Sequence, residues 1–95
     1  MPVVEYALLR VDPARADDFR RAFDAARGDL DGATGASGAR LRRDVADDRA
    51  WLLEVTWERL EQHTVTFPAS DGGRRFAAAV GAFFVEPPVV VHVAA

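Results

Sequence analysis

The chain changes its hydrophobic period several times, and each change marks a different element. Residues 3–11 read VVEYALLRV, a run of β-branched, aromatic and aliphatic side chains that predicts a strand. Asp12-Pro13 follows as an N-cap and a proline at the first helical position. An apolar stripe at helical spacing comes next, made of Phe19, Phe23, Ala26 and Leu30. The pattern therefore predicts a helix over residues 13–30.

The middle of the chain alternates between turns and short strands. Residues 31–38 (DGATGASG) contain three glycines and predict a turn. Residues 39–44 alternate as a strand does, and Asp47-Asp48 lies in a predicted hairpin loop. Residues 50–57 (AWLLEVTW) form the most apolar of the predicted strands.

The last third of the chain predicts two helices and a strand. The first helix covers residues 58–67 and is expected to end at Pro68, because proline breaks a helix interior. Ser70 can cap the second, which is predicted from Asp71 to about Val85. Beyond Pro87-Pro88, residues 89–93 (VVVHV) predict the final strand.

This order of elements, βαββαβ, predicts an α+β ferredoxin-like fold in a single domain over residues 1–95. Short connections and right-handed crossovers would give a four-stranded antiparallel sheet with its helices on one face. Two strands are nevertheless apolar on both faces, 50–57 and 89–93. Since strands of this kind need cover on both sides, we expect a second copy of the chain to pack on the open face as a symmetric homodimer.

Composition narrows the classes of function. The chain has 95 residues, a net charge of −3 and no cysteine, so it has no disulfide and no thiolate ligand or nucleophile. The acidic balance argues against a nucleic-acid partner. The longest apolar run, residues 76–85, is shorter than the ~20 residues of a membrane span. Because residues 1 and 2 lead straight into the first strand without a basic leader, we expect a cytoplasmic location and no membrane partner.

Residues 57–67 (WERLEQHTVTF), directly after an apolar strand, resemble the signature segment of the antibiotic biosynthesis monooxygenase (ABM) family. In that segment a strand ends in Trp, a helix carries His six residues later, and Phe follows four residues beyond. Other matching features are Gly38, Ser70 followed by Phe76, and a valine-rich last strand with His92. The resemblance covers nearly the whole chain. It implies a dimeric α+β barrel with a ligand pocket between the sheet and the helices of each subunit.

The resemblance also implies an activity: cofactor-independent monooxygenation of a small aromatic, quinol or polyketide-like substrate. Such chemistry needs a base that deprotonates the substrate, an aromatic wall and a dry cavity. His63 is the candidate base, because imidazole titrates near neutral pH. The expected substrate-binding residues are Trp57, Phe67, Tyr6 and Glu54.

Each of these residues also has a structural alternative. His63 could pack at the boundary between helix and sheet, and Trp57 could belong to the core. Tyr6 suits a subunit interface equally well. Glu54, within the apolar strand 50–57, could pair with an arginine of the preceding strand, and His92 could be structural or lie at an interface.

Two other functions remain open: a non-catalytic small-ligand-binding or accessory dimer, and an isomerase of a small carbonyl compound. We expect no metal, since the two histidines lie on separate elements and no cysteine is present. We expect no haem, because alanines follow Phe76 where the haem-degrading branch of the family carries its histidine. Residues 72–75 (GGRR) could hold an anion at a helix start or form a loosened N-terminus.

Overall fold

Four strands form one antiparallel sheet in the order β2-β3-β1-β4 in the computed structural model, which describes residues 1–95. The strands are β1 (Val3–Arg10), β2 (Ala36–Arg43), β3 (Ala50–Trp57) and β4 (Val89–Ala94). Every neighbouring pair runs antiparallel, and β1 lies in the middle, between β3 and β4. This arrangement confirms the predicted ferredoxin-like α+β fold.

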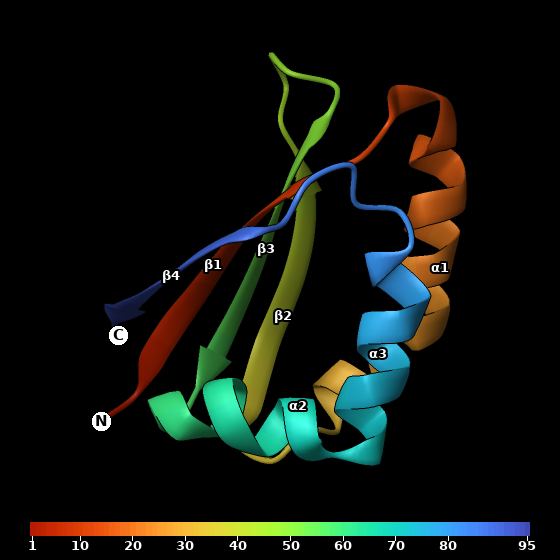
Figure 1. Ribbon diagram of the computed structural model, residues 1–95. Helices are drawn as coiled ribbons and strands as arrows, with labels where there is room; N and C mark the ends of the chain where they lie inside the picture. Colours follow the sequence, from red (N-terminus) through yellow and green to blue (C-terminus); the bar gives the residue numbers. More distant parts are fainter.

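The helices lie on one face of this sheet, as Figure 1 shows for α1 and α3. A short 3₁₀ turn, η1 (Pro13–Arg15), leads into α1 (Ala16–Asp31). After β3 come a π-helical turn, η2 (Gln62–Thr66), the short α2 (Phe67–Ala69) and α3 (Asp71–Gly81). None of these helices has the length and apolar character needed to cross a membrane.

The helical segment after β3 differs from the predicted one. Pro68 does not end it; the proline lies in the first turn of α2, and the segment ends at Ser70. The turn before the proline is π-helical, with the Phe67 N–H donating to the Gln62 carbonyl oxygen five residues back. Proline is tolerated in a first helical turn, where no intrahelical partner for its missing N–H is needed.

Two other boundaries also move. Strand β2 begins at Ala36, three residues earlier than predicted, because a bulge between Ser37 and Arg40 absorbs Gly38 into the strand. Gly38 has φ +63°, which glycine adopts without steric cost. Helix α3 ends at Gly81 instead of near Val85. The residues beyond return to the sheet, where Phe84 forms an isolated bridge with Val11.

The core lies between the sheet and the two long helices. Strand β3 alternates as predicted: Trp51, Leu53, Val55 and Trp57 are buried on the helix face. From α1, Phe19 and Phe23 are fully buried against them, and Phe76 of α3 meets the Phe23 ring edge-on. The opposite face of the sheet carries no helix. Several of its large apolar side chains are exposed, namely Leu52, Val89, Val91 and Val93.

Candidate active site

An apolar cavity of about 240 Å³ lies between the sheet and the helices. Most of its lining is aliphatic or aromatic and comes from β1, β3, β4, the α2 segment and both long helices. The lining residues are Glu5, Ala7, Leu9, Phe23, Leu53, His63, Phe67, Pro68, Gly73, Phe76, Ala77, Val80, Phe84, Pro88 and Val90. Only two of these are titratable: Glu5 and His63.

Glu5 is a buried carboxylate in the central strand. It lies on the helix face of β1, paired across the sheet with Val55 on one side and His92 on the other, and it is only 4% exposed. The indole Nε1–H of Trp57 donates to its Oε1 over 3.0 Å. Burial raises the pKa of Glu5, and the hydrogen bond from Trp57 opposes part of that rise. The sequence pattern points to Glu54, as the carboxylate within an apolar strand, and not to Glu5.

His63 lies over Glu5 and is hydrogen-bonded to His92. Its Nε2 is 3.4 Å from Glu5 Oε1, and its Nδ1 is 2.7 Å from His92 Nε2. The ring stacks on Trp57, with centroids 5.1 Å apart and planes 17° from parallel. Burial, and then the neighbouring His92, lower the pKa of His63 to about 4. The imidazole is therefore neutral at pH 7.

His92 joins this cluster from the edge strand. It is directly opposite Glu5 in the register of β1 and β4, and its side chain is half-exposed. The sequence indicated a structural or interface residue, with no link to His63. Because the two histidines come from distant elements, only the β1–β4 register and the position of the π-helical turn bring them together.

The three groups form a chain, with Glu5 and His92 at opposite nitrogens of His63. They therefore do not converge on one point where an ion could sit. No group of three or more His, Asp or Glu side chains in the structure is placed to hold a metal.

The two predicted aromatic residues have different places. Phe67 lines the cavity, as expected for a residue that contacts a ligand. Trp57 is fully buried and is absent from the lining. It lies behind the cluster, where it donates to Glu5, supports the His63 ring and packs against Phe67 with centroids 5.6 Å apart. Trp57 thus positions the titratable groups.

Tyr6 and Glu54 lie away from this cavity. They are cross-strand partners on the helix-free face of the sheet, where both line a shallow open depression. Glu54 Oε1 accepts from Arg42 Nη2 over 3.0 Å, so it pairs with an arginine of the preceding strand. The cavity that contains Glu5 and His63 is therefore built without either residue.

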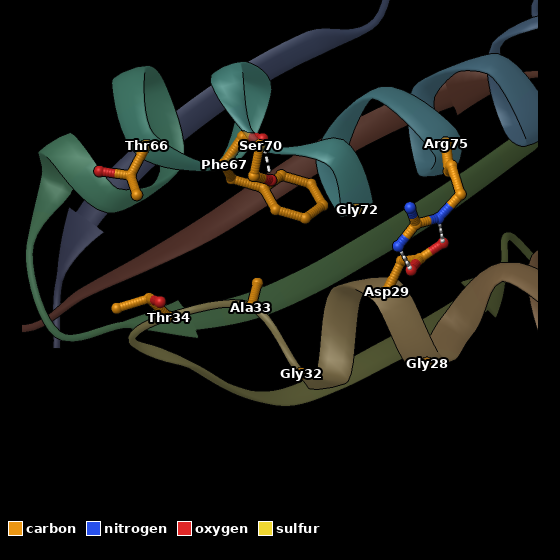
Figure 2. A pocket seen from close by; sticks show the side chains of 10 residues that line it. All are labelled: Gly28, Asp29, Gly32, Ala33, Thr34, Thr66, Phe67, Ser70, Gly72 and Arg75. Atoms are coloured by element: carbon orange, nitrogen blue, oxygen red, sulfur yellow. Dashed lines mark hydrogen bonds and ion pairs between the residues drawn. The ribbon is translucent and has the colours of Figure 1, made fainter.

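A second, polar groove of about 290 Å³ lies between the end of α1 and the start of α3 (Figure 2). Arg75 spans it and binds Asp29, its Nη2 lying 2.8 Å from Asp29 Oδ1. This contact raises the pKa of Arg75 and lowers that of Asp29. The Gly73 N–H is already bonded to Ser70 Oγ, and Arg74 pairs with Asp71. Both arginines of residues 72–75 are thus neutralised, which leaves little attraction for an anion.

Comparisons with known proteins agree with this architecture over its full length. A candidate antibiotic biosynthesis monooxygenase from Bordetella bronchiseptica superposes with a TM-score of 0.93 at 32% identity, over 99% of this chain and 96% of that one. SnoaB, a cofactor-independent oxygenase from Streptomyces nogalater, shares the fold with a TM-score of 0.78 at 18% identity, over 99% of this chain and 92% of its own.

Sequence similarity points the same way. YczJ of Bacillus subtilis, an uncharacterized protein, is 30% identical over 90 residues, which are 95% of each chain. The model of the family described as antibiotic biosynthesis monooxygenase matches residues 2–79. With that match over most of its length, the chain belongs to the antibiotic biosynthesis monooxygenase family.

Proposed function

We propose that the protein is a cofactor-independent monooxygenase whose substrate, a small aromatic, quinol or polyketide-like compound, binds in the apolar cavity. Membership of the family supports a monooxygenase-type activity. The single observation that carries the proposal is the chain Glu5–His63–His92 in the wall of an otherwise apolar cavity. Glu5 and His63 both have shifted pKa values, and titratable groups of this kind that line a cavity are typical of active sites.

The cavity suits an aromatic substrate that must become an anion. Phe23, Phe67 and Phe76 give it aromatic walls, and most of the remaining lining is aliphatic. Its volume of about 240 Å³ lies just below the ~300–1,000 Å³ common for ligand pockets, which favours a substrate of one or a few fused rings.

The reaction begins when the substrate gives a proton to the cluster. The resulting anion passes one electron to dioxygen, and the two radicals combine to form a peroxide. Protonation of the peroxide and loss of water leave a carbonyl or quinone on the ring. The protein supplies the base, the orientation and the dry site, while dioxygen is the oxidant.

Oxygen uptake tests this proposal. We expect the protein to accelerate oxygen consumption with an anthrone or a naphthohydroquinone as probe. The double variant Glu5→Gln/His63→Ala, which removes both titratable groups of the cavity, should lower the rate by ~100-fold or more, the usual contribution of a general acid or base. Glu61→Gln is the matched control, because Glu61 is an exposed carboxylate on the same helical segment. An unchanged rate in the double variant would remove the role proposed for the cluster.

We also propose that the helix-free face of the sheet joins two copies of the chain. It combines exposed Leu52, Val91 and Val93 with charges of both signs, since Arg42 and Glu54 lie on the same face. In a two-fold interface the same surface of each copy packs against that of the other. Apolar positions of one copy can then meet apolar positions of its partner, and positive charges can meet negative ones.

Sedimentation equilibrium at micromolar concentration tests the dimer. The expected mass is twice the 10.4 kDa of the chain. Val91→Arg should shift the protein to the monomer, because it places a charge among the exposed valines of this face. Glu61→Gln again serves as the control. A stable 10.4 kDa species in the unmodified protein would contradict the proposal.

A further inference from the structure

We propose that Glu5, and not His63, takes the proton from the substrate, and that His63 and His92 relay this proton to the edge of the sheet. This inference rests on the proposed function only in that the substrate is an acid bound in the apolar cavity. Glu5 and His63 differ in which of their polar atoms already have a hydrogen-bond partner within the protein.

The two ring nitrogens of His63 face different neighbours. Nδ1 is 2.7 Å from His92 Nε2, a short hydrogen bond in which one ring donates and the other accepts. Nε2 lies 3.4 Å from Glu5 Oε1 without a hydrogen bond to it. When Nδ1–H donates to His92, Nε2 is the acceptor nitrogen of the neutral ring, and it lies next to Glu5. His63 is therefore placed to take a proton from Glu5.

Glu5 has a free acceptor. Trp57 Nε1 and His63 Nε2 both lie at Oε1, and no group of the protein hydrogen-bonds Oε2. Since Glu5 lines the cavity, Oε2 is available to a molecule bound there. A carboxylate that is held by Trp57 and buried among apolar side chains is well placed to act as a general base.

No other titratable group of the cavity competes with Glu5. Helix α1 contributes Phe23 to the lining, and α3 contributes Phe76, Ala77 and Val80. The groups that face the carboxylate are thus Trp57 from β3, His63 from the π-helical turn and His92 from β4.

The proton can leave by a balanced sequence of transfers. The substrate's acidic bond to hydrogen breaks, and the hydrogen passes to Glu5 Oε2 while the electron pair stays on the substrate. The carboxyl group of Glu5 then turns so that its O–H points to His63, and it gives that proton to His63 Nε2. His63 Nδ1–H passes its proton to His92 Nε2, and His92 Nδ1–H releases one to water. One proton enters the chain and one leaves, and each imidazole stays neutral after the transfer.

The geometry gives this path an exit. Glu5 is in the central strand β1 and is 4% exposed, whereas His92 lies on the edge strand β4 and is half-exposed. The three side chains thus lead from the apolar cavity to the edge of the sheet. Run in reverse, the same path returns a proton when the peroxide must be protonated.

Anaerobic hydrogen exchange tests the base separately from oxygen chemistry. Anthrone is incubated with the protein in D₂O without oxygen, and loss of the methylene signal is followed by proton NMR. We expect the protein to accelerate deuterium incorporation and Glu5→Gln to lower that rate by ~100-fold or more. Glu5→Asp, which keeps the carboxylate, should retain part of the rate and covers the case in which Glu5→Gln fails to fold. Glu61→Gln should exchange as the unmodified protein does.

A second variant tests whether His92 passes a proton on or only holds His63 in place. In His92→Ala the proton taken by Glu5 has no exit, so it returns to the same substrate molecule. Deuterium incorporation should then fall more than oxygen uptake, because dioxygen captures the anion before the proton returns. Added imidazole should restore the exchange. Equal losses in both rates, without rescue, would overturn the relay.

The outcomes distinguish this inference from the proposed function. Exchange at the unmodified rate in Glu5→Gln overturns the role of Glu5, even if oxygen uptake continues. No exchange by the unmodified protein overturns it as well. Exchange that depends on Glu5 without any oxygen uptake supports the base and refutes the monooxygenase, and it would indicate a proton-transfer enzyme.

Discussion

The low pKa of His63 makes folding stability depend on pH in a way that one substitution can remove. In the unfolded chain His63 has its ordinary pKa of 6.5, whereas burial and His92 lower the pKa to about 4 in the folded protein. Between these two pH values the unfolded chain binds a proton that the folded protein refuses. The contribution of His63 to stability is therefore fully present above pH 6.5 and is lost as the pH falls through 4.

The size of the effect follows from the same numbers. A gap of about 2.5 pH units corresponds to about 3 kcal/mol in the free energy of unfolding. The side chain is 21% exposed, so solvent screens little of this. Glu5 acts in the opposite sense: its raised pKa gives stability at low pH that is lost as the pH rises through the folded-state value. A variant of His63 alone isolates the histidine.

His63→Gln keeps a polar side chain but cannot titrate. We expect the unmodified protein to lose about 3 kcal/mol more than this variant between pH 7 and pH 4. Urea unfolding followed by the fluorescence of Trp51 and Trp57 measures the difference, at one fixed protein concentration. In the unmodified protein, the His63 ring proton should titrate near pH 4 by NMR, with His92→Gln resolving the two signals. A midpoint near 6.5, or equal pH dependence in both proteins, would refute the burial argument.

Three further predictions concern the support of the site. Trp57→Phe removes the 3.0 Å donor to Glu5, worth ~1.5–3 kcal/mol to a charged acceptor, so the pH profile of anthrone exchange should move up by about one to two units. Phe23→Ala should lower the free energy of unfolding by ~3–5 kcal/mol in urea, because the ring is fully buried against Phe76. Gly73→Ala would place Cβ 1.7 Å from the Phe67 carbonyl oxygen and should cost ~1–3 kcal/mol by the same measure. Gly28→Ala is its control, because nothing lies within 4 Å of the new methyl group, and it should stabilise the helix by up to ~1 kcal/mol. Equal effects at the two glycines would contradict the packing argument.

The fold could be predicted from local patterns because each element carries its own signal. Asp12 caps the first helical turn and Ser70 caps α3, as expected from their side chains. The alternation in β3 correctly assigned one face to the core. The π-helical turn could not be predicted, because nothing in the spacing of residues 58–67 separates a π turn from an α turn.

The site was only half predictable for a different reason. His63 and Phe67 lie at the cavity as the family pattern suggested, but Glu5 and His92 meet them through pairing between strands at opposite ends of the chain. One local signal was available. Alternate residues of a strand point to the same face, so Glu5 points the same way as Ala7 and Leu9, which face the core. Each face of this strand mixes apolar residues with a charged one, so the sequence does not show which face belongs to the core. Tyr6 was assigned to the cavity for the same reason.

The pKa values of Glu5 and His63 are shifted in opposite directions, and these shifts bear on which of the two groups receives a proton. In water an imidazole holds its proton more tightly than a carboxylate does, since the ordinary pKa values are 6.5 and 4.5. Burial disfavours the charged form of both groups, so it raises the pKa of the carboxyl and lowers that of the imidazole. The two shifts act against the order of basicity in water, since they make the carboxylate a stronger base and the imidazole a weaker one. Glu5 can then act as the base, and His63 passes a proton along as a neutral ring that gains one on Nε2 while it gives one from Nδ1. An imidazole between a carboxyl and a second imidazole can do this without ever carrying a charge in the apolar cavity.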